Sequence, residues 1–198
     1  MFAKARRIAI PTMVLGLGLA IVYVFASAAG GGERASRLER LATGSMAGLD
    51  FAYAGDAVPG ETFADPAGAE TTLAAFAGRA TLVNLWATWC APCEREMPSL
   101  AALQSARGGE AFQVVAISVD DADQADFARG QLAEWTGGVL DFYHAPDFAI
   151  SYGLGARGFP TTVLFDADGR EVARLSGEAD WSSYEAVAFI DAALAGAR

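Results

Sequence analysis

Two cysteines, Cys90 and Cys93, are the residues of this chain whose type and spacing indicate the clearest chemistry. They are the only two cysteines among 198 residues, and they form a Cys-x-x-Cys pair. An apolar run that includes Trp86 and ends at Trp89 leads directly into them, which predicts a strand that delivers the pair to the start of a helix. Because a helix N-terminus stabilises a thiolate, this arrangement predicts a thiol-disulfide redox centre without cofactor or metal.

Two other uses of the cysteine pair explain the sequence less well. A purely structural disulfide across so few residues would remove little conformational entropy from the unfolded chain. A zinc site typically needs four nitrogen or sulfur ligands, whereas the chain offers two cysteines and one histidine, His144. The redox interpretation is therefore preferred.

Other polar residues are expected to have structural roles. His144 precedes a predicted short helix, where we expect a partly buried, hydrogen-bonded imidazole instead of a ligand. The acids Asp120, Asp121, Asp123 and Asp126 lack the glycine and terminal glutamate of an EF-hand loop. They are interpreted as charges at the start of a helix.

The elements that position the cysteines follow from the pattern of apolar residues. Residues 82–87 predict a buried central strand, and a helix is expected from Cys90 to about residue 107, with Pro92 tolerated in its first turn. Residues 112–119 are almost continuously apolar, as is typical of a strand buried on both faces and paired in parallel with the first.

The second half of the chain predicts an antiparallel hairpin followed by a helix. Residues 161–165 and 171–175 flank a turn, and Ser182 with Glu185 forms a capping box that opens a C-terminal helix. A smaller hairpin is expected at residues 61–73, before the core. The order βαβ, α, ββα predicts an α/β domain with a mixed central sheet and helices on both faces.

The first residues of the chain indicate export. Residues 8–32 contain no charge and follow Lys4, Arg6 and Arg7, so the positive-inside rule places residues 1–7 in the cytoplasm and residues 8–29 across the membrane. A cleaved signal peptide is the alternative, because residues 26–28 fit a small-residue cleavage site. Residues 30–50 are expected to be a linker and residues 51–198 the folded domain.

The charge of the exported part excludes one class of partner. Without Lys4, Arg6 and Arg7, 11 of the 14 basic residues remain against 24 acids, a net charge of −13. This balance argues against nucleic acid and favours neutral or basic partners.

With Trp-Cys-x-Pro-Cys after the first core strand and Gly-Phe-Pro-Thr at residues 158–161, the chain resembles the thioredoxin fold. The stretches 82–90 and 93–98 more closely resemble the membrane-anchored, periplasmic TlpA-like branch of thioredoxins. The resemblance implies an exposed nucleophile at Cys90 and a less exposed resolving thiol at Cys93, and the hairpin at residues 61–73 would be an N-terminal extension of this fold.

The resemblance also implies roles for residues around the pair. Pro160 is expected to follow a cis peptide bond, so that Phe159 can pair with an extended substrate, and Trp89 and Pro92 would add contact surface. Asn84 stands where cytoplasmic thioredoxins carry a buried aspartate. Glu96 stands where exported relatives carry a glutamate, which implies that Glu96 performs the proton chemistry; the alternative is a solvated carboxylate in the first half of the helix, stabilised by the helix dipole.

Direction and partners are expectations of the same kind. The residues between the cysteines, Ala91 and Pro92, lack the histidine often found in oxidants of this fold, which favours a reductase. We expect it in the bacterial inner membrane, with its folded domain in the periplasm. Its partners would be an integral-membrane dithiol donor and a cytochrome c precursor, a copper chaperone or the copper-binding oxidase subunit. The alternatives are a disulfide oxidase or isomerase and a Sco-type copper chaperone; the latter resemble CxxxC with a ligating histidine, unlike this chain.

Overall fold

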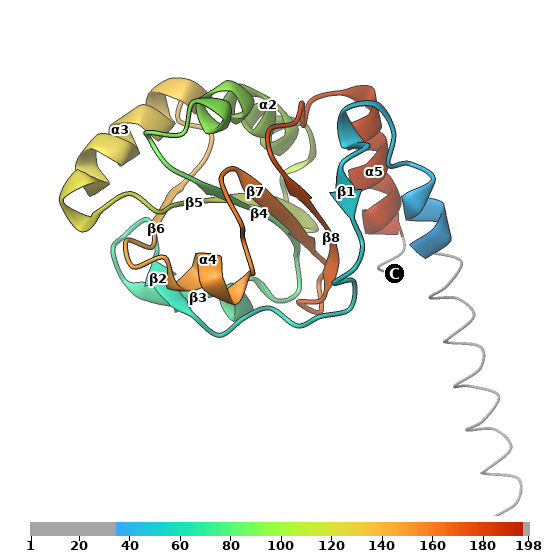
Figure 1. Ribbon diagram of the computed structural model, residues 1–198, viewed down its shortest axis with the longest axis horizontal. Coiled ribbons are helices and arrows are strands. Elements are labelled where there is room, and N and C mark those ends of the chain that lie inside the picture. Colours follow the sequence, from blue (N-terminus) through green and yellow to red (C-terminus); the bar gives the residue numbers. More distant parts are fainter. Residues whose placement is uncertain (1–34, 196–198) are drawn as a thin grey trace, which may run out of the picture. The chain divides into compact units, whose positions relative to one another are not determined.

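The central strand of the molecule is β4 (Ala80–Trp86), every residue of which is buried. The computed structural model describes residues 35–195 (Figure 1). Side chains alternate along β4: Leu82 and Trp86 belong to the apolar cluster on one face of the sheet, and Val83 and Leu85 to the cluster on the other. The predicted buried strand is therefore confirmed.

The sheet has eight strands in the order β1-β8-β7-β4-β5-β6-β2-β3. β4 pairs in parallel with β5 (Phe112–Ser118) and antiparallel with β7 (Thr161–Phe165), which confirms the predicted mixed sheet. The other strands are β1 (Leu49–Asp50), β2 (Thr62–Ala64), β3 (Glu70–Thr72), β6 (Phe142–His144) and β8 (Glu171–Ser176). The predicted hairpins are β7 with β8 and, at the sheet edge beside β6, β2 with β3.

Helices cover both faces of the sheet, as predicted. The helices α2 (Ala91–Arg107), α3 (Ala125–Thr136) and α5 (Tyr184–Ala195) contribute to the cluster that contains Leu82 and Trp86. The short helix α4 (Ala149–Gly153) and the 3-10 turn η2 (Leu73–Phe76) contribute to the opposite cluster. Figure 1 shows α2 and α3 together on one side of the central strands and α4 on the other.

The prediction that residues 30–50 form a linker is wrong for the second half of this range. The compact unit begins at Leu38, and both Leu38 and Met46 are buried in its core. Met46 lies in the 3-10 turn η1 (Gly44–Met46), and β1 pairs with β8. The sequence pattern missed this segment because its buried side chains are too few and too widely spaced to show a helix or strand period.

The predicted N-cap of α5 is displaced by one residue. The Ser183 hydroxyl accepts a hydrogen bond from the backbone N–H of Ala186 at 3.2 Å, which is the capping interaction expected of Ser182. The Ser182 hydroxyl instead donates to the Asp180 carboxylate at 2.6 Å. Two adjacent serines offer the same chemistry, so the sequence alone could not distinguish them.

The predicted transmembrane span, residues 8–29, and the basic tail, residues 1–7, lie outside the described residues. Within residues 35–195, no helix has both the length and the apolar character needed to cross a bilayer.

Candidate redox site

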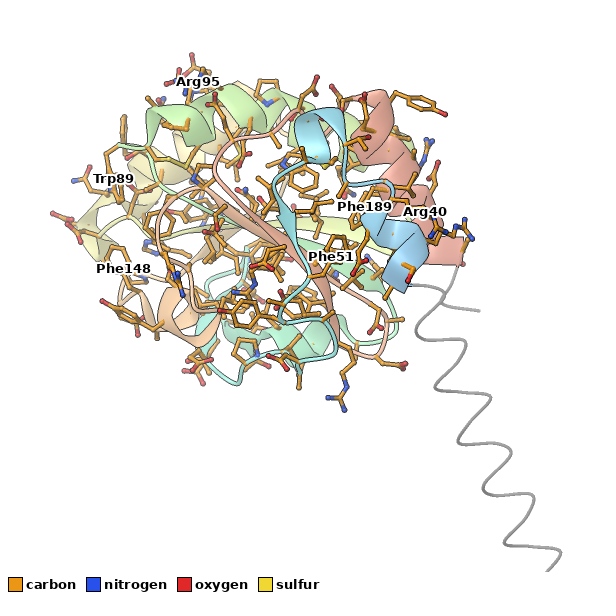
Figure 2. All side chains as sticks on the ribbon, turned by 45° about the vertical axis from the view of Figure 1, so that its right-hand side comes forward. Arg40, Phe51, Trp89, Arg95, Phe148 and Phe189 are labelled. Atoms are coloured by element: carbon orange, nitrogen blue, oxygen red, sulfur yellow. A yellow bond between two sulfur atoms is a disulfide. The ribbon has the colours of Figure 1, made fainter. Side chains whose placement is uncertain are left out.

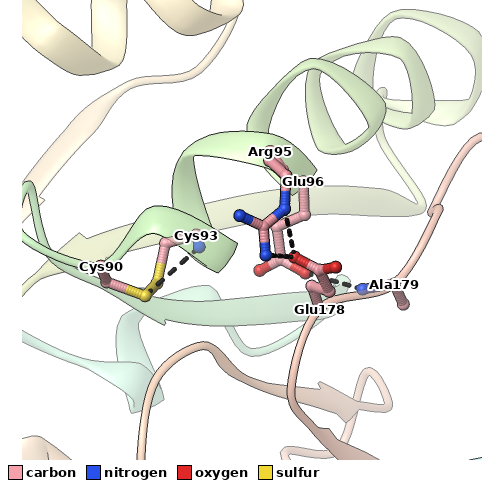
Figure 3. Close-up of polar contacts among 6 residues, drawn as sticks. All are labelled: Cys90, Cys93, Arg95, Glu96, Glu178 and Ala179. Carbon is pink, nitrogen blue, oxygen red and sulfur yellow. Dashed lines mark hydrogen bonds and ion pairs between the residues drawn. A yellow bond between two sulfur atoms is a disulfide. The ribbon is translucent and has the colours of Figure 1, made fainter.

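Cys90 and Cys93 form a disulfide at the N-terminus of α2, with an S–S distance of 2.04 Å (Figure 3). Cys90 is the N-cap residue, and its Sγ accepts a hydrogen bond from the backbone N–H of Cys93 at 3.2 Å. Pro92 lies in the first turn, where its missing N–H costs no helical hydrogen bond. A donor of the first turn thus already points at the Cys90 sulfur, an arrangement that stabilises the thiolate after reduction.

Cys90 is less exposed than expected. Its exposed fraction is 5%, against 0% for Cys93, so the expected order is correct but both residues are buried. The Cys90 sulfur is bonded to Cys93 and accepts a hydrogen bond from the first turn of α2. A partner disulfide therefore has to come close to the protein surface around Cys90 to reach its sulfur.

Two segments 70 residues apart meet beside the disulfide. The peptide bond between Phe159 and Pro160 is cis, as predicted. The Phe159 ring lies edge-on to the ring of Trp89, with their centroids 5.7 Å apart, and the centroid of the Phe148 ring lies 6.1 Å from that of Phe159. Trp89 is 63% exposed, and Figure 2 shows Trp89 and Phe148 toward the same end of the molecule. These residues form an aromatic surface next to Cys90.

Glu96 is a buried carboxyl group one helical turn beyond Cys93, on the same face of α2. It accepts hydrogen bonds from Asn84 Nδ2 at 2.6 Å, the backbone N–H of Ala179 at 3.2 Å and Trp181 Nε1 at 3.4 Å. Within the described residues it forms no ion pair. Burial, reinforced by the charge of nearby Glu178, raises the pKa of Glu96 from 4.5 to about 7 although the three hydrogen bonds lower it.

Asn84 connects Glu96 to the central sheet. It lies in β4, and its side-chain amide donates to Glu96 and, at 2.9 Å, to the Thr162 hydroxyl. The sequence singled out Asn84 and Glu96 separately, and the structure joins them in one hydrogen-bonded group. Asn84 holds the side chain of Glu96 without adding a charge.

A cavity of about 550 Å³, open to solvent and lined mainly by polar and charged residues, adjoins Glu96. Arg95 and Glu178 line the cavity and form an exposed ion pair, with Arg95 Nε 2.8 Å from Glu178 Oε2 (Figure 3). Ser99 lines it as well and hydrogen-bonds the backbone N–H of Trp181. The buried carboxyl thus has a route to water that does not pass the disulfide.

The prediction that Asp120 is a charged residue at the start of a helix is wrong. Its side chain is 2% exposed and accepts hydrogen bonds from the Thr88 backbone N–H at 3.0 Å, the Thr88 hydroxyl at 2.6 Å and the Ser118 hydroxyl at 2.8 Å. The missed signal is positional: Asp120 follows a strand parallel to β4, and the carboxyl ends of parallel strands meet at one edge. That edge carries Cys90.

His144 is the partly buried, hydrogen-bonded imidazole that was expected. It is 9% exposed, its Nε2 is 2.8 Å from the backbone oxygen of Asp120, and its ring stacks on Phe142. No group of three or more histidine, cysteine, aspartate or glutamate side chains suited to a metal ion occurs in the part of the chain that the structure describes.

Comparison with known proteins agrees with this geometry. The model of the Redoxin family matches residues 53–190. The thiol-disulfide oxidoreductase ResA of Bacillus thuringiensis is 32% identical over 63% of this chain and 70% of its own. The thiol:disulfide interchange protein HelX of Rhodobacter capsulatus is 32% identical over 50% of this chain and 53% of its own.

Solved structures support the fold. A thiol:disulfide interchange protein of the thioredoxin family from Chlorobium tepidum superposes with a TM-score of 0.58 at 23% identity, covering 71% of this chain and 97% of that one. Fold, family match and the Cys90–Cys93 disulfide agree. The chain belongs to the Redoxin family, as a thiol-disulfide oxidoreductase of the TlpA-like thioredoxin branch.

Proposed function

We propose that this oxidoreductase works as a reductase of disulfides in exported proteins. The observation that carries the proposal is the Cys90–Cys93 pair at the start of α2, placed between the aromatic surface of Trp89 and Phe159 and the buried carboxyl of Glu96. One side of the pair offers a place for a partner, and the other offers a proton acceptor.

The reaction begins from the reduced protein. The Cys90 thiolate attacks one sulfur of a partner disulfide, forming a mixed disulfide and releasing the other partner sulfur as a thiolate. Cys93 then loses its thiol proton and attacks the Cys90 sulfur, which restores the Cys90–Cys93 disulfide. The partner leaves with both of its cysteines reduced, having received two electrons.

Glu96 is proposed as the group that accepts the Cys93 proton. It lies one turn from Cys93 on α2, and its pKa of about 7 lets it both take and release a proton near neutral pH. The cavity beside it gives that proton a way out while a partner covers Cys90. A proton acceptor poised in this way suits the resolving step.

The proposed partner surface consists of Trp89, Pro92 and Phe159; Pro160, which was expected to belong to it, is buried behind its cis peptide bond to Phe159. Trp89 is well exposed, and its ring contacts that of Phe159, so the two offer apolar area next to the attacking sulfur. An extended partner segment could pair with the Phe159 backbone while its cysteine reaches Cys90. The net negative charge of the exported part would favour a neutral or basic segment.

Compartment and electron supply complete the proposal. We place residues 8–29 in the bacterial inner membrane and the folded domain in the periplasm, on the basis of the charge pattern of the first residues. A reductase in an oxidising compartment needs a supply of electrons, for which we propose an integral-membrane dithiol donor. The TlpA resemblance suggests cytochrome c precursors, or copper chaperones and the copper-binding oxidase subunit, as targets.

A trapping experiment tests the proposed activity. Cys93→Ala removes the resolving thiol, so the membrane-bound variant should accumulate mixed disulfides between Cys90 and its exported partners. The double variant with Cys90→Ser is the matched control and should trap nothing. Absence of any trapped protein in the single variant would contradict the claim of specific partners.

The direction is tested separately by equilibrium with glutathione. A reductase requires a reduction potential well below that of a strong disulfide oxidant, which is about −120 mV. A measured potential near that value would contradict the reductase and favour the oxidase alternative.

A further inference from the structure

Asp120 is a buried carboxylate that the reaction described above does not use. Its two oxygens accept from the Thr88 backbone N–H, the Thr88 hydroxyl and the Ser118 hydroxyl. Each of these groups donates to an oxygen of the Asp120 carboxylate, so both oxygens have hydrogen-bond partners. Within the described residues no ion pair includes Asp120, so its charge is held by neutral donors alone.

The carboxylate is tied to the turn that carries Cys90. Thr88 lies two residues before Cys90, and the Cys90 backbone N–H donates to the carbonyl of Ala87 at 3.1 Å, which closes this turn. On the other side, Val119 N–H donates to the Trp86 carbonyl at 2.9 Å, so the end of β5 is fixed to the end of β4. Asp120 therefore links the turn that carries Cys90, which follows β4, to the end of β5.

A buried negative charge at this position acts on the two redox states differently. The reduced site develops a negative charge on Cys90, whereas the disulfide carries none. A fixed anion close by disfavours the thiolate and thus the reduced state, in the opposite sense to the α2 N-terminus. Other ionisable groups of the described residues near the site are Glu96 and exposed Glu94 and Arg95 on α2, Glu178, which pairs with Arg95, and His144 on β6, whose Nε2 contacts the Asp120 backbone.

We propose that Asp120 is a positioning residue of the redox site: it fixes the Thr88 turn and, as a buried anion, disfavours the Cys90 thiolate, which makes the reduced protein a stronger reductant. The proposal rests on the redox activity of the Cys90–Cys93 pair. It also supplies a physical reason for the reducing direction.

Asp120→Asn tests the charge while keeping the size of the side chain. The expected result is a Cys90 thiol pKa lower by about one unit, measured from the pH dependence of alkylation of the reduced protein. The equilibrium constant with glutathione should shift about tenfold toward the dithiol, equivalent to a potential about 30 mV higher. Asp121→Asn is the matched control, because it removes an equal but exposed charge from the next residue and should change both values less than twofold.

A purely structural role makes a different prediction. Loss of a structural hydrogen bond would destabilise the oxidised and reduced proteins equally, so unfolding would become easier while the thiol pKa and the glutathione equilibrium stayed unchanged. That result would overturn the proposal. It would leave the proposed reductase activity standing, since Asp120→Asn retains both cysteines and should still form mixed disulfides when Cys93 is also replaced.

Thr88→Val provides an independent test if Asp120→Asn does not fold. It removes one hydroxyl donor that partly offsets the negative charge of Asp120, and it keeps that charge. The Cys90 thiolate should therefore become less favourable, and the pKa of the Cys90 thiol should rise. Thr88→Ser, which restores the hydroxyl, should return the pKa to the wild-type value. A Thr88→Val protein with an unchanged or lower pKa would refute the electrostatic role.

Discussion

Two buried glutamates, Glu96 and Glu171, have opposite surroundings. Glu171 in β8 is 4% exposed and faces Arg174, whose guanidinium donates to both of its carboxylate oxygens. Arg174 also donates to the Leu154 carbonyl and lies over the ring of Tyr53 at 4.0 Å. Glu96 is 2% exposed and receives hydrogen bonds only from an amide, a backbone N–H and an indole.

The difference separates a structural carboxylate from a proton-exchanging one. Next to Glu171, the pKa of Arg174 is raised, chiefly by their hydrogen bonds, so the guanidinium stays charged and the pair holds β8 against the loop after α4. Without a cation, burial raises the pKa of Glu96 to about 7, and a small change in its surroundings suffices to move a proton. Burial alone thus does not identify the functional acid: Glu96 combines burial and the lack of a cationic partner with a position one helical turn from Cys93.

The largest expected effect comes from removing the cation of the structural pair. Arg174→Met leaves Glu171 buried without compensation and should lower the free energy of unfolding by about 3–5 kcal/mol, measured by urea denaturation of the oxidised protein. The glutathione equilibrium should be unchanged. Arg170→Met is the matched control, because that arginine is exposed and should cost little. A loss below about 1 kcal/mol would contradict the structural role of the pair.

Glu96→Gln should remove a pH dependence of stability. The pKa of Glu96 is raised from 4.5 to about 7 on folding, so between these values the unfolded chain has released the proton and the folded protein retains it. Stability therefore falls as the pH rises through this window, by up to about 3 kcal/mol.

Urea denaturation at pH 5 and pH 8 measures this prediction. The wild type should lose stability relative to Glu96→Gln between the two pH values, whereas exposed Glu94→Gln should follow the wild type. Parallel behaviour of wild type and Glu96→Gln would show that the carboxyl is not held protonated.

The smallest effect is expected at the exposed ion pair over the cavity. The side chains of Arg95 and Glu178 are 59% and 46% exposed, so Arg95→Ala should change the free energy of unfolding by no more than about 0.5 kcal/mol. The difference should vanish at high salt. A larger loss in the free energy of unfolding that does not depend on salt would contradict this prediction and would show that the pair stabilises the protein as a buried ion pair does.

The sequence predicted most of the elements around the cysteines because they are encoded locally. The continuous apolar runs gave β4 and β5, and the position of Pro92 after Cys90 gave the start of α2. The cis bond before Pro160 came from the resemblance to thioredoxins, since nothing in the residues alone requires it.

The sequence missed features that depend on distant partners. Asp120 looked like one of four helix-start acids because its partner Thr88 lies 32 residues earlier. The hydrogen bond from Asn84 to Glu96 and the burial of Met46 likewise depend on how separate elements pack. Charge and polarity can be read from a sequence, but the groups that compensate a buried charge become visible only in three dimensions.

The central claim, that Glu96 accepts the Cys93 proton, is tested most directly by the resolving step itself. A mixed disulfide between Cys90 and a short peptide is prepared, and the rate of peptide release is measured from pH 5 to pH 9. The wild-type rate should rise to a plateau above about pH 7, where Glu96 is ionised. Glu96→Gln should release the peptide about 100-fold more slowly at pH 7 and show no plateau there. Equal rates and equal pH profiles for the two proteins would contradict the account.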